Sequence, residues 1–375
     1  MIKTKHILIT VAAMLAAGCD QSTQPRYPDI GSSLSVSASA DVGAVYLSSN
    51  DASGNELLVF ARATDGTLTA AGTVPTGGLG TSGALNNQLS MVLTEDERHL
   101  YVVNAGSDDI SGFRLRGESL EPIGAPVPSG GDQPISLTVH GNLLYVLNAG
   151  AGANVTGFSI ATDGSLTAIA ASTQPLSGEG TGAAQIQFTP RGDVLVVTEK
   201  ATNTITTYVV DAQGRAGAPH AQASAGTTPF GFAFSTRGNL IVSEAGSGAA
   251  SSYRVGRDGF LTLVSASVST TQAAPCWVVI SESGLDAYTT NTGSGTVSRF
   301  AIGAGASLTL VEGAAGVTGA GSLPQDADFT PGSRFLYVRN ANGSVSAFRV
   351  ERDGALEHIG DSTPIPDFAN GIVAR

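Results

Sequence analysis

Basic residues are scarce in this sequence, and lysine is scarcer than arginine. The 375 residues include 19 Lys and Arg against 31 Asp and Glu, which gives a formal net charge of −12 at pH 7. The only lysines are Lys3, Lys5 and Lys200. Binding to nucleic acid needs a basic surface that neutralises phosphates. The charge balance therefore predicts that nucleic acid is not a partner.

The sequence also lacks the short motifs of common catalytic and cofactor sites. It contains no GxSxG nucleophile elbow, no phosphate-cradling GxxxxGK, no HExxH and no paired CxxC. Glycine-rich stretches such as AGSG from Ala245 are typical of turns rather than of nucleotide loops. A tightly bound nucleotide or zinc ion is therefore not expected.

The N-terminus has the pattern of a cleaved secretory signal that ends in a lipidation site. An apolar run from Ile7 to Ala17 follows two lysines and is too short to anchor the chain in a bilayer. LAAGC resembles the bacterial lipobox, so residues 1–18 are predicted to be a signal peptide and Cys19 to be acylated. Asp20 resembles the signal for retention on the inner membrane. We expect a lipid-anchored protein on its periplasmic face, or on the outer surface of a Gram-positive membrane.

Removal of the signal peptide changes the charge and the thiol content. It takes away two lysines and no acids, leaving 17 basic and 31 acidic side chains and a net charge of −14. With Cys19 acylated, Cys276 is the only remaining thiol, so no intramolecular disulfide can form. Residues 19–40, which contain this Cys and are rich in Ser, Gln and Ala, are predicted to be a flexible tether.

Long helices are not expected, because 48 Gly and 16 Pro without a collagen-like period indicate many tight turns. Comparing the chain with itself reveals seven copies of one unit, spaced roughly 44 to 55 residues apart, which is the size of a propeller blade. Six clear copies begin with LYVVN at Leu100, LYVLN at Leu144, LVVTE at Leu195, LIVSE at Leu240, AYTTN at Ala287 and LYVRN at Leu336, and a looser copy begins at Val45.

Each unit carries the signals of four strands. A short strand such as PISLTV from Pro134 precedes the quoted motif, a third strand follows it, and a DG turn leads to a fourth, as in TDGSLTAI from Thr162. The first unit lacks an innermost strand, whereas the chain ends in the unassigned fragment NGIVAR. We therefore predict an all-β fold over residues 41–375: a seven-bladed propeller of four-stranded antiparallel blades, with Gly371 to Ala374 closing the ring.

The repeats resemble those of the lactonase-type seven-bladed propellers, the group of 6-phosphogluconolactonase, 3-carboxymuconate-lactonising enzyme and the YVTN-repeat proteins. The resemblance covers roughly residues 41–375 and rests on LYVVN, LYVLN, AYTTN and LYVRN with the aromatic residues that trail them, such as Phe113 and Phe348. It implies lactone chemistry. The family usually carries a histidine-bearing segment at the start of a first strand, and the equivalent stretch from Gly180 has no histidine.

The residues that end the predicted second strands are expected to ring the mouth of the central channel, on the face that carries the long Gly-rich loops. They are Asn104, Asn148, Glu199, Glu244, Asn291 and Asn340. The neighbouring carboxylates of Glu199 and Glu244 could hold a cation, act as acid and base, or orient sugar hydroxyls. The alternative is that all six side chains only cap turns by hydrogen-bonding backbone amides.

Three further residues complete the predicted site. The resemblance makes Glu199 and Arg191 the nearest counterparts of the family's acidic and basic groups. In a lactonase, Glu199 would polarise water or the ring oxygen, and Lys200 or Arg191 would stabilise the oxyanion. Trp277, the only tryptophan, would stack on a ring substrate or pack between blades. The catalytic candidates are Glu199, Lys200, Arg191 and Glu244, and the binding candidates are the four Asn residues and Trp277.

Two classes of function remain open. The first is an envelope-anchored, lactonase-like enzyme that hydrolyses or forms a sugar or muconate-type lactone. The second is a non-enzymatic scaffold that binds a protein or glycan partner at the membrane surface. The resemblance favours the first, and the missing histidine and the many small residues favour the second. The expected partners are a small-molecule lactone or sugar, or an envelope protein, with the chain as a monomer. No cofactor is expected, with calcium at Glu199 and Glu244 as a further alternative.

Overall fold

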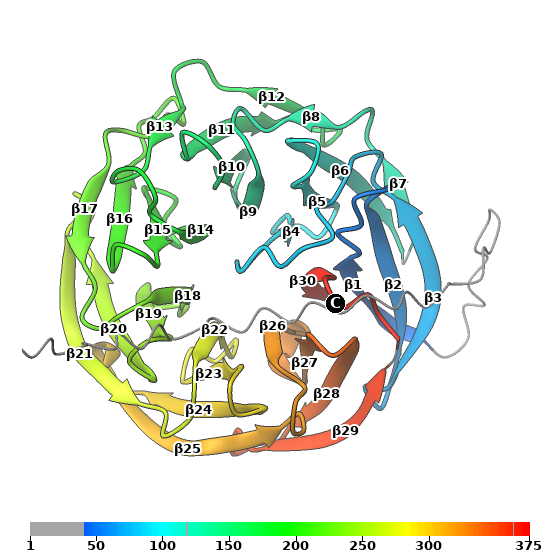
Figure 1. Cartoon of the computed structure of the whole chain (residues 1–375), viewed down its shortest axis with the longest axis vertical. Coiled ribbons are helices and arrows are strands. Elements are labelled where there is room, and N and C mark those ends of the chain that lie inside the picture. The colour runs from blue at the N-terminus through cyan, green and yellow to red at the C-terminus, as the bar shows by residue number, and fades with distance from the viewer. Residues whose placement is uncertain (1–40, 118, 363) are drawn as a thin grey trace, which may run out of the picture. The chain divides into compact units, whose positions relative to one another are not determined.

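Seven antiparallel sheets stand around a central axis (Figure 1). The computed structural model describes residues 41–117, 119–362 and 364–375. It confirms the predicted seven-bladed propeller of four-stranded blades, with one additional short strand in each of blades 2 and 3. The predicted signal peptide, Cys19 and tether lie outside the described residues. None of the described helices has the length and apolar character needed to cross a membrane.

The first four blades are formed by residues 41–223, and the C-terminal strand completes blade 1. Blade 1 contains β1 (Asp41–Ser48), β2 (Glu56–Ala63), β3 (Leu68–Pro75) and β30 (Asn370–Ala374). Blade 2 contains β4 (Met91–Leu93), β5 (His99–Asn104), β6 (Asp109–Arg116), β7 (Ser119–Pro122) and β8 (Val127–Pro128). Blade 3 contains β9 (Pro134–His140), β10 (Leu143–Asn148), β11 (Asn154–Ile160), β12 (Leu166–Ala168) and β13 (Gln174–Pro175). Blade 4 contains β14 (Ala183–Phe188), β15 (Val194–Glu199), β16 (Thr204–Val209) and β17 (His220–Ala223).

The remaining three blades follow the same order from the axis outward. Blade 5 contains β18 (Pro229–Phe234), β19 (Asn239–Glu244), β20 (Ala249–Val255) and β21 (Leu261–Ser269). Blade 6 contains β22 (Pro275–Ile280), β23 (Asp286–Asn291), β24 (Thr296–Ile302) and β25 (Leu308–Val317), with the short helix η1 (Ala304–Ala306). Blade 7 contains β26 (Pro324–Phe329), β27 (Phe335–Asn340), β28 (Ser344–Val350) and β29 (Leu356–Ser362), with the short helix η2 (Pro331–Ser333).

The C-terminal strand closes the ring. β30 pairs antiparallel with β1, with Val45 opposite Ala374 and Tyr46 opposite Val373, so the last residues supply the innermost strand of blade 1. The backbone of Arg375 adds two further hydrogen bonds to Ala44, of 2.9 and 3.1 Å. The predicted closure by Gly371 to Ala374 is confirmed. Closure leaves neither blade 1 nor blade 7 at an open end of the assembly.

The hydrophobic core lies between neighbouring blades, because successive side chains of a strand point to opposite faces. In β15, Val194 and Val196 pack against Phe232 of blade 5, whereas Leu195 and Val197 belong to the cluster shared with blade 3. The same alternation recurs around the ring. Each blade is therefore buried on both faces, which explains the nearly continuous apolar sequence of the second strands.

Tyrosine hydroxyls link the second strand of one blade to the turn between the third and fourth strands of the next, which is a DG turn in three cases and the turn DAQG at Gly214. Four such residues donate to a turn-glycine carbonyl, each at 2.7 Å: Tyr101 to Gly164, Tyr145 to Gly214, Tyr288 to Gly354 and Tyr337 to Gly66. All four glycines have a positive φ, which favours glycine. At the junction of blades 4 and 5, Thr207 of β16 donates instead to the turn glycine Gly259, at 2.8 Å. The repeated Tyr and the repeated turn glycine are therefore two halves of one contact between blades.

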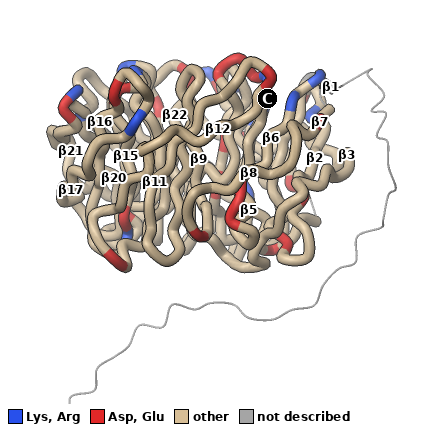
Figure 2. Tube along the Cα trace, turned by 90° about the horizontal axis from the view of Figure 1, so that it is seen from above, with Lys and Arg blue, Asp and Glu red and all other residues tan. Residues whose placement is uncertain are grey.

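Charged residues gather in the turns at the two ends of the ring, and the strands between them carry few (Figure 2). Charged or titratable side chains within the ring are exceptions, and they identify the places where chemistry can be sought.

Candidate functional site in the central channel

The innermost strands each have one edge without a neighbouring strand, and side chains from the preceding blade bind to it. The backbone amides of Ile186 and Phe188 in β14 donate to the hydroxyls of Ser136 and Thr138 in β9, at 3.1 and 3.0 Å. The Gln185 side chain of β14 likewise exchanges two hydrogen bonds of 2.7 Å with the backbone of Phe232 in β18. Buried backbone groups need such partners. The polar side chains of the first strands are thus used in assembly.

Residues 86–89, here called the plug segment, belong to the connection between blades 1 and 2. They pass near the centre of the ring just before the chain enters β4 (Figure 1). Asn87 joins three other blades. Its amide donates to the carbonyl of Ile135 and accepts from the amide of Asn370 at 3.0 Å, and its carbonyl accepts from the Trp277 indole at 2.6 Å. The side chain of Asn87 is buried. The chain itself therefore occupies the middle of the channel.

Gln88 of the plug segment supplies a contact that blade 5 lacks. Its side chain exchanges two hydrogen bonds with the backbone of Val278 in β22, at 2.8 and 3.1 Å. Gln185 makes the same exchange from the third position of its strand, but blade 5 has Gly231 at that position. A Cβ atom on Gly231 would lie 2.2 Å from Gln88 Oε1. The missing side chain of Gly231 therefore leaves the space that Gln88 occupies.

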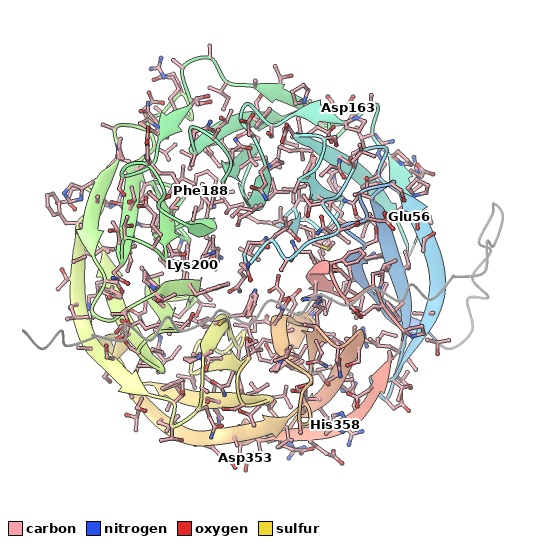
Figure 3. All side chains as sticks on the ribbon, in the orientation of Figure 1. Glu56, Asp163, Phe188, Lys200, Asp353 and His358 are labelled. Atoms are coloured by element: carbon pink, nitrogen blue, oxygen red, sulfur yellow. The ribbon has the colours of Figure 1, made fainter. Side chains whose placement is uncertain are left out.

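Lys200 lies on the inner side of the ring beside the plug segment (Figure 3). Its amine donates to the carbonyls of Asn86, at 2.5 Å, and Ala183, at 3.0 Å, and lies 4.7 Å from the centroid of the Phe230 ring. The side chain is partly exposed. Desolvation lowers the pKa of Lys200 to about 8, and the nearby Cys276 thiol partly offsets this effect. Of the predicted catalytic residues, Lys200 is the one whose functional group is placed at the channel.

Trp277 packs between blades and offers no exposed ring face. Its ring lies 4.8 Å from that of Phe230, and both belong to a buried cluster with Ala184 and Cys276. The side chain is 4% exposed, and its N–H is bound to the plug segment. Of the two roles considered for Trp277, the structure supports packing. A substrate cannot stack on it in this arrangement.

Glu199 is buried within blade 4 and does not border an open channel mouth. Its carboxylate accepts hydrogen bonds from the backbone amide and hydroxyl of Ser177, from Thr202 and, at 2.8 Å, from Thr206. These donors lie before β14, after β15 and on β16. The predicted exposed position is wrong because the side chain turns into the sheet and caps its end, so water and substrate do not reach it.

Glu244 occupies the same position in blade 5. Its carboxylate accepts from the Gly226 amide at 2.7 Å, from Ser251 at 2.5 Å and from Ser267 at 2.6 Å. It is also fully buried. The predicted exposed pair of Glu199 and Glu244 is therefore corrected to two separate carboxylates, each holding the strands of its own blade together.

Four asparagines occupy the equivalent positions of other blades. Their neutral side-chain amides also connect the second strand to the third. Each side-chain amide donates to a side chain at the start of the third strand; the residues are Asn104, Asn148, Asn291 and Asn340. All four are completely buried. The expected caps on backbone amides are not formed, because these side chains bond to other side chains instead. The structure does not expose the four residues at a channel mouth, and their role in binding stays a prediction.

Arg191 lies at the opposite end of β15 from Glu199. It precedes this six-residue strand, whose length separates the two by about 20 Å. Its guanidinium forms an ion pair of 2.9 Å with Asp193 and is 38% exposed. Arg191 and Glu199 therefore do not converge on one substrate, and the predicted pairing of the two is wrong.

The channel wall of blade 7 carries titratable residues that the sequence analysis missed: Asp326 and Arg339 are buried, and Asp328 is partly buried. Asp326 and Asp328 alternate along β26, and burial raises their pKa values to about 8 and about 7. Asp328 accepts from the Ala374 amide at 2.9 Å, whereas Asp326 Oδ2 and Arg339 Nε have no hydrogen-bond partner among the described residues. Two carboxylates in the first-strand sequence PQDADF were the available signal, because the other first strands contain no acid.

The described residues contain no group of three or more His, Cys, Asp or Glu side chains placed to hold a metal ion. Every carboxylate oxygen of Glu199 and Glu244 already accepts a hydrogen bond from the protein. The channel can therefore present the Lys200 amine at its end and, along its wall, the carboxyls of Asp326 and Asp328, whose pKa values are raised.

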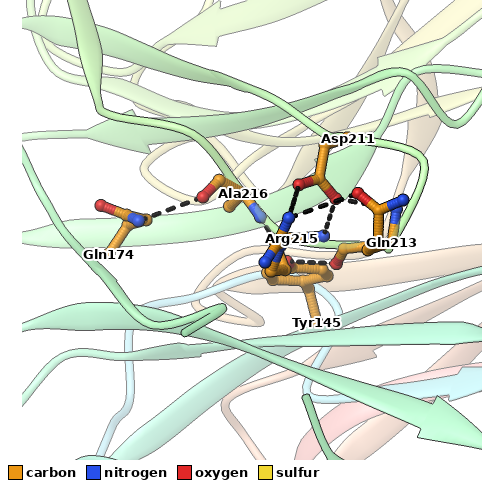
Figure 4. Close-up of polar contacts among 7 residues, drawn as sticks. Tyr145, Gln174, Asp211, Gln213, Arg215 and Ala216 are labelled. Atoms are coloured by element: carbon orange, nitrogen blue, oxygen red, sulfur yellow. Dashed lines mark hydrogen bonds and ion pairs between the residues drawn. The ribbon is translucent and has the colours of Figure 1, made fainter. Parts of the chain in front are cut away.

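A shallow cleft of about 380 Å³ lies at the outer rim and is lined by residues of blade 4, with Ala171 of blade 3 at its border. Arg215 and Asp211 form an ion pair of 2.8 Å there, and the Ala216 amide donates to the Tyr145 hydroxyl at 2.7 Å (Figure 4). The Tyr145 hydroxyl also donates to the turn glycine Gly214, as described above. The polar groups of this cleft therefore join two blades, and it lies away from the channel.

Comparison with known proteins places the chain among related propellers. The model of the lactonase family of 7-bladed β-propellers matches residues 53–174 and 90–277, which together span more than half of the sequence. The chain belongs to this lactonase family. No curated protein matches the sequence. Family membership and the geometry agree on the fold, and the reaction has to be argued from the residues.

Solved structures of low sequence identity share the fold. A Lactobacillus plantarum protein has a TM-score of 0.72 at 21% identity, over 89% of this chain and 100% of its own. The periplasmic gluconolactonase of Pseudomonas aeruginosa has a TM-score of 0.69 at 17% identity, over 88% and 98%. A virginiamycin B lyase from Staphylococcus aureus has a TM-score of 0.53 at 13% identity, over 72% and 83%. Because lyases and lactonases both occur here, this likeness shows the fold alone.

Proposed function

We propose that this lactonase-family protein hydrolyses a small lactone of the sugar-acid or muconate type at the end of the channel where Lys200 meets the plug segment. Family membership supports the choice of reaction. A similar solved structure is that of a periplasmic gluconolactonase, which supports the choice of substrate class. The proposal moves the reaction away from Glu199 and Glu244, because both are inaccessible.

The observation that carries the proposal is the position of the Lys200 amine. Hydrolysis of a lactone passes through a tetrahedral intermediate whose oxyanion needs a preorganised donor. Lys200 donates two of its three N–H groups to carbonyls of the protein and retains one. It is partly desolvated, which strengthens its interaction with a developing negative charge. Lys200 would thus hold the oxyanion while water attacks the carbonyl carbon.

The test compares Lys200→Met and Lys200→Arg with the parent on glucono-δ-lactone, 6-phosphogluconolactone and a muconolactone, with acid release followed at constant pH. Removing one oxyanion donor typically lowers kcat by roughly 100-fold or more, so Lys200→Met should fall by that amount and Lys200→Arg by less. Arg191→Ala is the matched control, because it removes a cation at the opposite end of the ring. A Lys200→Met protein as active as the parent would refute the proposal.

A second function, that of a non-enzymatic scaffold for a protein or glycan, is favoured by the plug segment. A filled channel leaves the long loops of that face as the accessible surface, and they expose Leu79 and Leu323. If the parent hydrolyses none of the lactones, the scaffold function predicts that a membrane-derived partner is retained by the parent and lost with Leu79→Ser and Leu323→Ser together. Retention of the partner by this double variant would exclude that surface.

We also propose that the protein is anchored to the envelope through an acylated Cys19, facing the periplasm from the inner membrane. The lipobox sequence LAAGC supports this location. Cys19→Ser should release the protein from the membrane fraction or leave it unprocessed, because the short apolar segment cannot replace acyl chains. A variant that matures and fractionates like the parent would contradict the anchor.

A further inference from the structure

The two ends of the ring carry different charges. The turns between first and second strands and between third and fourth strands lie at one end, here called the turn end, and the remaining connections lie at the other, here called the loop end. All 15 arginines of the described residues except Arg339 lie at or near the turn end, interspersed with acids (Figure 2). Among the described residues of the loop end, Lys200 is the only basic side chain that is not buried. The exposed or half-buried acids of the loop end include Asp51, Asp108, Asp109, Asp132, Glu179 and Asp367. An anionic surface would therefore repel the loop end more strongly than the turn end.

The chain also enters the propeller at the turn end. β1 begins at Asp41, which lies opposite Ala63, just before the turn between β2 and β3. Residues 19–40 connect the predicted acylation site to this point, and a segment of that length spans at most about 80 Å. This length lets the ring reach the bilayer, and the charges of its two ends then decide which end faces the lipid.

Arginines and large apolar side chains are exposed together on the turn end of blades 5 and 6, in a group here called the basic-apolar patch. Its members are Arg237, Arg257, Phe260 and Leu285. Phe260 is 56% exposed and Leu285 is 48% exposed. The Arg257 guanidinium lies 3.9 Å from Asp193, whose carboxylate is already paired with Arg191 at 2.9 Å. Arg257 is therefore open to an external anion.

The patch is continuous across the two blades. A Cβ atom on Gly284 would lie 2.7 Å from the Thr236 hydroxyl, so the turn of blade 6 touches that of blade 5. The acids Asp258 and Glu282 lie in the same turns, and each accepts a hydrogen bond from a backbone amide. Within the described part of the chain, neither acid forms an ion pair with an arginine of the patch. Cationic and apolar groups are thus presented side by side, as on surfaces that bind the lipid headgroup layer.

We propose that the basic-apolar patch docks the turn end of the propeller on an anionic phospholipid surface, so that the loop end and Lys200 face away from the membrane. The guanidinium groups would bind lipid phosphates while Phe260 and Leu285 enter the headgroup layer. The acids of the loop end lie about 20 Å away, the length of a six-residue strand such as β15, whereas the screening length is about 10 Å at 0.1 M salt. Their repulsion is therefore weak at the bilayer. The inference uses the proposed anchor at Cys19 only to bring the ring to the membrane.

The experiment measures binding to vesicles without the lipid anchor. Protein that begins at residue 19 with Cys19→Ser carries no acyl chain and retains all of the described residues. It is sedimented with vesicles of phosphatidylcholine alone and of phosphatidylcholine with an equal amount of phosphatidylglycerol. At about 0.1 M salt the bound-to-free ratio should be at least about 10-fold higher on the anionic vesicles, and at about 0.5 M salt the excess should fall below about 2-fold.

Variants locate the binding surface. Arg237→Gln together with Arg257→Gln should lower the bound-to-free ratio on anionic vesicles at least about 10-fold, since each arginine near the surface contributes about fivefold. Phe260→Ser should lower it several-fold. The matched controls are Arg116→Gln, which removes an exposed arginine of blade 2, and Leu323→Ser, which removes an exposed leucine of the loop end. Each control should change the ratio by less than about 2-fold, because both side chains lie outside the patch.

The outcomes separate the docking surface from the anchor. Equal sedimentation on the two kinds of vesicle, or none at millimolar lipid, would overturn the docking surface, and so would equal losses in the patch variants and the controls. The anchor is tested by fractionation of full-length Cys19→Ser protein in cells. Vesicle binding through the patch together with failure of that fractionation test would refute acylation and keep the docking surface. A confirmed anchor without vesicle binding would refute the docking surface alone.

Discussion

Two pairs of carboxylates in this propeller have opposite surroundings. Glu199 and Glu244 end second strands and receive four and three hydrogen bonds from nearby hydroxyls and amides. Asp326 and Asp328 lie on the first strand of blade 7 and accept hydrogen bonds from backbone amides. Asp328 accepts one at each oxygen, whereas Asp326 Oδ2 has no partner among the described residues. The first pair was expected at the site and is structural. The second pair was not expected and carries the raised pKa values.

The difference lies in what the sequence places around each acid. Hydroxyls and backbone amides from neighbouring strands and turns supply several hydrogen-bond donors to each Glu at the end of a second strand. The channel side of β26 offers mostly backbone and apolar neighbours, so desolvation dominates and the neutral acid is favoured. In this propeller, the acidic residues with few hydrogen-bond donors are therefore the ones whose pKa values are raised.

The largest predicted effect is a loss of stability as the pH rises. Asp326 and Asp328 have higher pKa values in the folded protein than in the unfolded chain, so the folded state binds more protons between about pH 4 and pH 8. Asp326 then lowers the free energy of unfolding by up to about 1.4 kcal/mol per pH unit between about pH 4 and pH 8. Asp328 adds a smaller decline between about pH 4 and pH 7, because it is partly exposed. We expect the thermal midpoint to fall markedly from pH 5 to pH 8.

Substitution separates these two acids from other groups. Burial lowers the pKa of His99, which contributes a smaller effect of the opposite sign near pH 6. Asp326→Asn should remove about half of the decline, because Asn cannot ionise. A parent protein that is equally stable at pH 5 and pH 8, with Asp326→Asn showing the same profile, would refute the raised pKa values.

Removing a hydrogen-bonded carboxylate should give the next largest effect. Glu244→Ala leaves the Gly226 amide and two hydroxyls without their acceptor in a buried site. We expect a loss of about 3 kcal/mol in the free energy of unfolding, measured by urea denaturation. Glu244→Gln keeps part of the acceptor and should lose less. A change below about 0.5 kcal/mol in Glu244→Ala would show that the network does not hold blade 5 together.

The same substitution at a neutral capping residue should cost less. Asn340 donates to Ser344 and Ser346 at 3.0 and 2.8 Å, and its own Oδ1 has no hydrogen-bond partner among the described residues. Asn340→Ala should lower the free energy of unfolding by about 1 to 2 kcal/mol by urea denaturation. If it cost more than Glu244→Ala, the charge of the glutamates would not be what distinguishes the two kinds of cap.

The smallest effect is expected at Arg191. Its ion pair with Asp193 is partly exposed to solvent, and such pairs contribute little. Arg191→Ala should change the free energy of unfolding by less than about 0.5 kcal/mol and should leave lactone hydrolysis intact. Loss of hydrolysis in a stable Arg191→Ala protein would return Arg191 to the site.

The repeats made the fold predictable, and the spare fragment NGIVAR made its closure predictable. Each copy of LYVxN encodes a whole strand and one half of the Tyr–Gly contact. A strand that is predicted poorly in one copy can therefore be placed from the other copies. The direction of the Glu199 side chain was not predictable in the same way. A strand end can turn its last side chain toward the axis or into its own sheet, and the sequence alone does not show where the donors lie.

The plug segment was not predictable for a different reason. TVPTGGLGTSGALNNQ from Thr73 has the composition of a long surface loop, and nothing in it indicates that Asn87 and Gln88 bind strands of distant blades. The combination that fixes Gln88 is a glycine at Gly231, more than 140 residues away in the sequence. Contacts of this kind appear only when all blades are assembled. Lys200 stood out by rarity, but its lowered pKa depends on that assembly.

The central claim is that Glu199 holds the structure together whereas the neighbouring Lys200 is free for chemistry. The most direct test compares the unfolding free energies of Glu199→Ala and Lys200→Met in urea at pH 7. The account predicts a loss of at least about 2 kcal/mol for Glu199→Ala, because four donors lose their acceptor. It predicts a change within about 1 kcal/mol for Lys200→Met, because a partly desolvated ammonium is replaced by an apolar side chain. The reverse order, with Lys200→Met the more destabilised, would contradict it.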